Sequence, residues 1–237
     1  MAVIDIKNLV KNYGKFEAVK GISFEVNSGE IFGLIGPNGA GKTTVLRVLS
    51  TLLTITSGSV KIMDIKLKEK PNEIRKLISY LPEDAGAYKN LTGRKYLTFI
   101  ANFFNSKNPQ DMVQKGIEIA DLDDRIDDKV DTYSKGMQRR LLVGRALMTN
   151  PKLAILDEPT SGLDVINAQE IRKIIKNTAR QGTTVLLSSH NMLEVEYLCD
   201  QIALIAEGKI IEEGKPKSMM EKYHANNIEE VFTKVVK

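Results

Sequence analysis

The residues best suited to chemistry form one glycine-rich stretch: Gly36, Pro37, Asn38, Gly39, Ala40, Gly41, Lys42, Thr43 and Thr44. Its spacing is G-x-x-x-x-G-K-[ST], the P-loop, in which backbone N–H groups surround the phosphates of a nucleotide. Glycines let the backbone take positive φ angles and approach a ligand closely. Lys42 would reach the terminal phosphates, and the Thr43 hydroxyl would bind Mg²⁺. The stretch therefore predicts a phosphate site at a helix N-terminus.

Other polar residues follow apolar runs that are typical of buried strands. Residues 30–35 form such a run before the glycines, and residues 44–49 continue as an amphipathic helix. Asp157 and Glu158 end the run 153–156, and His190 ends the run 184–189. In parallel sheets, ligands bind beyond the carboxyl ends of the strands. We therefore expect these residues and the P-loop to meet at one edge of a sheet.

Each residue expected at that edge has a chemical role to offer. An aspartate that ends an apolar strand beside a P-loop is typical of a Mg²⁺ site, which gives Asp157 its role. Glu158 is well placed to orient or deprotonate an attacking water. His190 would donate a hydrogen bond to the γ-phosphate, although a histidine that ends a strand more often has a structural role.

Strands alternate with helices along most of the chain, which predicts a mostly parallel sheet. Residues 2–7 and 22–26 alternate in polarity and predict an antiparallel sheet at the N-terminus. Tyr13 lies between them, where it either packs or stacks on a base. The pattern also predicts strands at 59–63, 77–81, 202–205 and 209–213, and helices at 71–78, 112–120, 137–149, 165–180 and 192–199.

The composition limits the class of protein. The 237 residues, 42% of them hydrophobic, suffice for one large α/β domain or two small ones. A net charge of +4 does not demand a nucleic-acid partner. We expect neither a signal peptide nor a membrane span, because no apolar run approaches about 18 residues. The single cysteine, Cys199, fits a reducing compartment and a buried position.

Two further segments leave alternatives open. Tyr96, Phe99 and Phe103 fall at helical spacing within residues 88–104, where they form either a core face or a face that docks a partner. Residues 121–131 contain six aspartates. Their spacing does not fit a Ca²⁺-binding EF-hand loop, because Ile126 stands where glycine is needed. The favoured interpretation of this segment is a solvated acidic linker.

A second loop provides the strongest evidence that this sequence resembles a known family. Residues 133–138, Tyr-Ser-Lys-Gly-Met-Gln, stand about twenty residues before Asp157 and resemble the signature loop of the ATP-binding cassette (ABC) family of transporter ATPases. Residues 159–164, Pro-Thr-Ser-Gly-Leu-Asp, resemble that family's D-loop. His190 matches its switch histidine and Tyr13 its aromatic platform for adenine. The matched motifs run from residue 13 to residue 190 in unbroken order.

The resemblance implies a fold and a domain organisation. The fold is α/β, a P-loop NTPase (RecA-like) core with an N-terminal antiparallel β subdomain and an inserted α-helical subdomain. The ATPase domain would span residues 1–213, with the helical subdomain at about 86–145. A C-terminal helical tail would span residues 214–237.

The resemblance also implies a head-to-tail dimer. ATP would lie between the P-loop of one copy and the signature loop of the other, where Ser134, Gly136 and Gln138 would contact it. The signature loop precedes a helix and so offers a second anion site. Two departures stand out. Lys135 and Met137 interrupt the commoner order of the loop, and Glu83 replaces the family's Q-loop glutamine as a candidate Mg²⁺ ligand.

The function that the resemblance implies is that of an ATP-binding and ATP-hydrolysing transporter subunit. It would use ATP and Mg²⁺, pair with a second copy or a paralogue, and drive a transmembrane permease on a separate chain. Its place would be cytoplasmic, peripheral on the inner face of the membrane, and export is favoured over import. The alternative is a soluble ABC-type ATPase that acts on nucleic acid or ribosomes, or an ATP-driven regulator. No nucleic-acid partner is expected.

Overall fold

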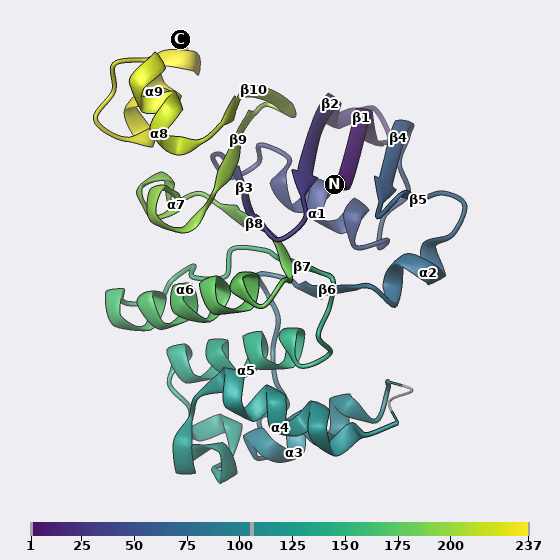
Figure 1. Ribbon diagram of the computed structural model, residues 1–237, viewed down its shortest axis with the longest axis vertical. Coiled ribbons are helices and arrows are strands. Elements are labelled where there is room, and N and C mark those ends of the chain that lie inside the picture. Colours follow the sequence, from purple (N-terminus) through teal and green to yellow (C-terminus); the bar gives the residue numbers. More distant parts are fainter. Residues whose placement is uncertain (1, 105–106, 237) are drawn as a thin grey trace.

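The computed structural model describes residues 2–104 and 107–236. It contains a four-stranded and a six-stranded sheet, with helices packed around the larger one (Figure 1). The N-terminal sheet lies on one side of the larger sheet, and most helices lie on the other side and below it. This arrangement agrees with the α/β fold expected from the sequence.

The N-terminal sheet is antiparallel, with the order β2-β1-β4-β5. Its strands are β1 (Ala2–Tyr13), β2 (Phe16–Asn27), β4 (Ser57–Ile62) and β5 (Ile65–Lys66). The first two are about twice as long as the polarity pattern predicts. Register shifts after Ile6 and Leu9 interrupt the alternation of buried and exposed side chains, so the alternating pattern in the sequence predicts only the first part of the strand. The longer hairpin brings Tyr13 directly opposite Phe16.

The larger sheet has the order β10-β9-β3-β8-β7-β6. Its strands are β3 (Ile31–Ile35), β6 (Ile78–Leu81), β7 (Leu153–Leu156), β8 (Thr184–Ser189), β9 (Gln201–Ala206) and β10 (Lys209–Gly214). All neighbours are parallel except β9 and β10, which form a hairpin. Because β3, β8 and β7 are adjacent, the segments that follow their carboxyl ends lie side by side, and these segments carry the P-loop, His190 and Asp157.

Alternate residues of the larger sheet point into two separate cores. Phe32, Leu34 and Ile155 face the N-terminal sheet and α1 (Lys42–Leu49). Ile35 and Leu156 face the helices on the opposite side. Since both faces are covered, the strands need apolar side chains on both sides, which explains their continuous hydrophobic runs.

A group of helices follows β6 and occupies the lower part of Figure 1. The short α2 (Pro71–Arg75) precedes β6, and the group itself contains α3 (Gly93–Ala101), α4 (Pro109–Ala120) and α5 (Lys135–Leu147). Between α4 and α5 lie the 3₁₀ turns Asp123–Asp127 and Val130–Thr132. The aspartates of residues 121–131 are exposed, as expected of a solvated acidic segment, but the segment is not a free linker, because Leu122, Ile126 and Val130 are buried and anchor it to the core.

The remaining helices are α6 (Val165–Arg180), α7 (Met192–Leu198), α8 (Pro216–Lys222) and α9 (Ile228–Val236). The last two form the C-terminal tail, which packs on α7 and β10. Met219, Ile228 and Val231 join the larger core, so the tail contributes buried surface to the rest of the chain. The domain boundaries given above stay predictions. Within the described ranges, no helix has the length and apolar character that crossing a membrane requires.

Candidate functional site

A cavity of about 270 Å³ opens over the P-loop. Its walls come from the β1–β2 hairpin, the P-loop, the loop after β6 and the turn after β7. The lining residues that the sequence predicted are Tyr13, Asn38, Gly39, Gly41, Lys42, Thr43, Thr44, Glu83 and Glu158. The cavity therefore gathers an aromatic ring, a phosphate-binding loop and two carboxylates from four distant segments.

The P-loop glycines serve two different purposes. Gly39 and Gly41 have φ angles of +80° and +107°, which side chains rarely adopt, so the predicted need for positive φ holds there. Gly36 does not have a positive φ, and that expectation was wrong. A Cβ at Gly36 would lie 2.1 Å from the carbonyl oxygen of Ile205, so close packing against β9 excludes a side chain. Pro37 and Ala40 complete the turn through the bond from Ala40 N–H to Pro37 O, 3.2 Å long.

Lys42 is held inside the loop. Its Nζ donates to the carbonyl oxygens of Gly36, at 2.7 Å, and Pro37, at 3.2 Å. It also forms an ion pair with Glu158 Oε1 at 3.4 Å, and both side chains are buried. Because these partners already satisfy the ammonium group, a nucleotide phosphate would have to compete with them for Lys42.

Asp157 is a buried carboxylate at the end of β7, and three hydroxyl groups reach it. Ser188 Oγ donates to its Oδ1 at 2.6 Å, and Thr43 Oγ1 donates to the same atom at 3.3 Å. Tyr80 Oη lies 3.5 Å from Oδ2. Burial and the charge of Asp157 raise the pKa of Tyr80 to about 12, so the phenol stays a donor at physiological pH. The pairing of Thr43 with Asp157 gives two oxygen ligands suited to Mg²⁺.

Glu158 occupies an unusual backbone conformation directly after Asp157. Its φ of +47° is rare for a residue with a side chain. The Ser188 hydroxyl accepts its N–H at 2.9 Å. Its Oε2 lies 2.9 Å from His190 Nδ1, while Oε1 is buried and accepts no hydrogen bond from the residues that the structure describes. A strained turn thus aims a buried carboxylate at the P-loop.

His190 lines a cavity next to the P-loop cavity. Its side chain is 45% exposed, and Nδ1 faces Glu158, so the outer part of the ring is open to a ligand. It lines a second cavity of about 210 Å³ together with Glu158 and Ser161 of the D-loop. The structure therefore brings His190 to the same edge of the sheet as Glu158, and its contact with that carboxylate was not predicted.

The signature loop does not reach the P-loop cavity. Ser134 begins α5 and accepts the N–H of Met137 at 3.2 Å. A Cβ on Gly136 would lie 2.1 Å from Asn167 Oδ1, so α6 excludes a side chain there. Gln138 lines a third cavity, which it shares with Glu83. None of the residues that line the P-loop cavity comes from the signature loop.

Four residues at the site escaped the sequence analysis. Phe16 lines the cavity opposite Tyr13, and Tyr80 and Ser188 contact Asp157. Arg139 donates to the carbonyl oxygens of Asp157 and Glu158 from the second turn of α5. Phe16 directly faces Tyr13 in the hairpin, so extending the N-terminal strands would have revealed it. The other three carry no motif that marks them.

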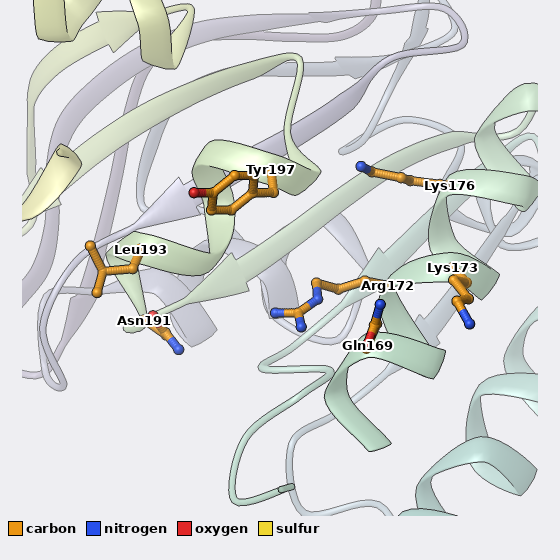
Figure 2. A pocket seen from close by; sticks show the side chains of 7 residues that line it. All are labelled: Gln169, Arg172, Lys173, Lys176, Asn191, Leu193 and Tyr197. Atoms are coloured by element: carbon orange, nitrogen blue, oxygen red, sulfur yellow. The ribbon is translucent and has the colours of Figure 1, made fainter. Parts of the chain in front are cut away.

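A larger cavity lies elsewhere, between α6 and α7. It measures about 520 Å³, and Figure 2 shows its lining side chains. Arg172 and Lys176 extend from α6 toward Tyr197 of α7, and Asn191 and Leu193 lie at the start of α7. The P-loop does not contribute to it. The chemistry of the lining residues, not the volume, therefore makes the P-loop cavity the candidate nucleotide site.

Comparison with known proteins agrees with this geometry. The sequence profile of the family "ABC transporter" matches residues 19–161, which include the P-loop, the signature loop and Asp157. The chain belongs to the ABC transporter family. Within this ABC family, the chain is 36% identical over 211 residues to the linearmycin resistance ATP-binding protein LnrL of Bacillus subtilis (strain 168). That match covers 88% of this chain and 68% of LnrL.

Two further ABC proteins are similar to this chain. One matches it over nearly its whole length, and the other is a solved structure. Nod factor export ATP-binding protein I of Burkholderia orbicola (strain AU 1054) is 34% identical over 234 residues, covering 98% of this chain and 77% of that protein. A solved dimeric ATP-binding cassette in a post-hydrolysis state, bound to ADP and Pi, superposes with a TM-score of 0.78 at 25% identity. It covers 90% of this chain and 98% of the other. This chain is an ATP-binding subunit and an ATPase of the ABC type.

Proposed function

We propose that the P-loop cavity holds MgATP with its adenine at the β1–β2 hairpin and its phosphates at α1. The main observation behind this proposal is that Tyr13, the P-loop and Glu158 line one cavity. Tyr13 and Phe16 offer apolar rings to the base. Backbone N–H groups of the P-loop, Thr44 and Lys42 would hold the phosphates. Mg²⁺ would bind Thr43 and Asp157, with Glu83 at the opposite wall.

Glu158 would position the water that attacks the γ-phosphate. Its buried Oε1 accepts no hydrogen bond from the described residues, and it points toward the loop that would carry the phosphates. A carboxylate there can orient the water and accept its proton. His190, held by Oε2, would donate from its outer nitrogen to the γ-phosphate. Lys42 would leave Glu158 for the phosphates when ATP binds, which would free Oε1 for the water.

Two copies would close head to tail around the nucleotide. The P-loop cavity of one chain lacks any contribution from the signature loop, so Ser134, Gly136 and Gln138 can act on ATP only from a second copy or a paralogue. Ser134 stands at the N-terminus of α5, where the helix favours an anion. ATP would then join the two copies, and loss of the γ-phosphate contacts would let them separate.

A separate permease would dock on the aromatic surface of α3. Tyr88 contacts Phe99 edge to face at 5.4 Å, and Phe99 contacts Phe103 at 5.1 Å, measured between ring centroids. All three rings are exposed, and aromatic residues are enriched where proteins dock. The surface lies on the same group of helices as the signature loop, so docking there could move both.

The transporter would be an exporter that holds this chain at the inner face of the membrane. Two of its relatives bear names that refer to Nod factor export and to linearmycin resistance. The direction of transport for this chain follows those names. The membrane position follows from the permease, because the described residues contain no membrane-spanning helix of their own.

The experiment is a pull-down of the tagged chain from its native membranes in mild detergent, followed by mass spectrometry. A multi-span membrane protein in stoichiometric amount is the expected result. The matched control is the variant Tyr88→Ser with Phe103→Ser, which should lose that protein while retaining ATPase activity. Recovery of soluble partners or nucleic acid alone, with the chain absent from membranes, would overturn the transporter proposal.

A further inference from the structure

One buried cation joins the segments that surround the γ-phosphate position. Arg139 is 8% exposed and stands in the second turn of α5, five residues after Ser134. Its Nε donates to Pro159 O at 2.8 Å, and its Nη1 donates to Glu83 O at 3.2 Å. Its Nη2 donates to two carbonyl oxygens, those of the residue pair Asp157 and Glu158, at 3.0 and 2.6 Å.

These partners are all backbone atoms, and they come from two distant stretches of the chain. Glu83 lies in the loop after β6, and residues 157–159 form the turn after β7 that leads into the D-loop. A planar guanidinium can reach all of them because its five N–H groups point in fixed directions. Bonds to backbone atoms set the path of the chain, so Arg139 constrains where each segment lies.

The constraint matters most at Glu158. That residue has a φ of +47°, which needs support from its surroundings to persist. Ser188 holds its N–H from one side, and Arg139 holds its carbonyl oxygen from the other. The two contacts together fix the peptide planes on both sides of the side chain. The direction of the carboxylate therefore depends on the position of α5.

Burying the Arg139 guanidinium away from water costs free energy, and nearby carboxylates and carbonyl oxygens offset that cost. Desolvation lowers the pKa of Arg139, while the charges of Glu83, Asp157 and Glu158 oppose that change. Those carboxylates lie on the same two stretches of chain whose carbonyl oxygens Arg139 binds. A neutral side chain would leave four carbonyl oxygens without this donor and would remove one positive charge from beside three carboxylates.

We propose that Arg139 is a positioning residue for ATP hydrolysis, whose guanidinium aims Glu158 and ties it to the Glu83 loop and to the start of the signature helix. Displacing α5 then displaces the carboxylate, so ATP is hydrolysed only when α5 is in place. The inference rests on the proposed role of Glu158 in positioning water.

The test compares Arg139→Met and Arg139→Lys with the matched control Arg140→Lys. Arg140 is the next residue on the same helix, and its Nη1 donates to Asp121 O, within the helical group. Purified full-length variants are assayed for kcat, for ATP affinity with a fluorescent ATP analogue, and for thermal melting.

Arg139→Met should lower kcat on the order of a hundredfold, as expected for a displaced catalytic group. Its ATP affinity should stay within about threefold, because Arg139 does not line the cavity. Arg139→Lys should lower kcat about tenfold, since one nitrogen cannot reach all four carbonyl oxygens. Arg140→Lys should stay within about threefold. A kcat for Arg139→Lys equal to that of the control, or a parallel loss of ATP affinity, would overturn the proposal.

A double variant separates this proposal from the one it rests on. With Glu158→Gln already present, adding Arg139→Lys should change the residual single-turnover rate by less than about threefold, because the group that Arg139 aims is gone. A further tenfold loss would show that Arg139 acts without Glu158 and would refute the positioning role. If Glu158→Gln alone keeps the parent rate, the proposed function fails instead.

Discussion

Replacing Glu158 by glutamine changes the side chain on which the proposed hydrolysis depends. The substitution keeps the shape of the side chain, and the amide oxygen can still accept a hydrogen bond from His190 Nδ1, now 2.9 Å from Oε2. The amide cannot accept a proton from water. Loss of a general base costs about 10² to 10⁴ in rate. At about 1.4 kcal/mol per tenfold change, this equals about 3–5 kcal/mol in the activation barrier.

ATP binding should respond in the opposite direction. Lys42 forms a buried ion pair with Glu158 at 3.4 Å, and it also has the carbonyl oxygens of Gly36 and Pro37 as partners. Without the negative charge of Glu158, the ammonium group is released to a phosphate more easily. We expect the Kd for ATP in Glu158→Gln to equal that of the parent or to fall severalfold.

The assay measures phosphate release under single turnover alongside equilibrium binding of a fluorescent ATP analogue. Asp84→Asn serves as the charge control, because Asp84 is exposed near the site and does not line the P-loop cavity. The control should keep the parent rate and affinity. A Glu158→Gln variant that hydrolyses ATP at the parent rate, or that loses binding together with turnover, would refute the reasoning.

Three further outcomes follow from single contacts. Phe16→Ala should raise the KM for ATP on the order of tenfold at unchanged kcat, because it removes a ring that would contact the base. The control is Leu52→Ala, which should leave the KM unchanged, because Leu52 is similarly exposed but does not line the cavity. Glu83→Gln should raise the half-saturating Mg²⁺ concentration severalfold in an ATPase titration, and an unchanged value would remove Glu83 from the metal site. Partial burial and the carboxylates of Glu25 and Glu30 raise the pKa of Glu213. A carboxyl group whose pKa is higher in the folded state stabilises that state at pH values below the pKa of the unfolded state. This contribution is lost as the pH rises through the pKa of the folded state. Glu213→Gln should therefore raise the melting temperature at pH 8 but not at pH 4, and equal shifts at both would contradict this.

The sequence predicted the parts of the site that depend on local pattern. The P-loop has a fixed spacing, and Asp157 and His190 each end a continuous apolar strand. Adjacent parallel strands then bring those ends together, so the meeting point followed from topology alone. The sequence alone therefore predicted that the P-loop, Asp157, Glu158 and His190 lie at one edge of the sheet.

The contacts made across the fold could not be predicted. Arg139 is one of several basic residues on α5, and nothing in the local sequence shows that its guanidinium turns toward the Glu83 loop and the turn after β7. The positive φ of Glu158 also follows from tertiary contacts, through Ser188 and Arg139. The charge count of residues 121–131 predicted their exposed aspartates, but it did not show that Leu122, Ile126 and Val130 anchor the segment to the core.

The head-to-tail dimer is the claim on which the proposed mechanism depends most, and disulfide cross-linking tests it directly. Differently tagged copies carry Asn38→Cys in the P-loop or Lys135→Cys in the signature loop, both exposed positions, in a Glu158→Gln background. The native Cys199 is buried, which limits its reaction. The account predicts a disulfide between the two different copies with MgATP, and none without nucleotide or with Lys42→Ala. Equal cross-linking with and without ATP, or cross-links only between identical copies, would contradict it.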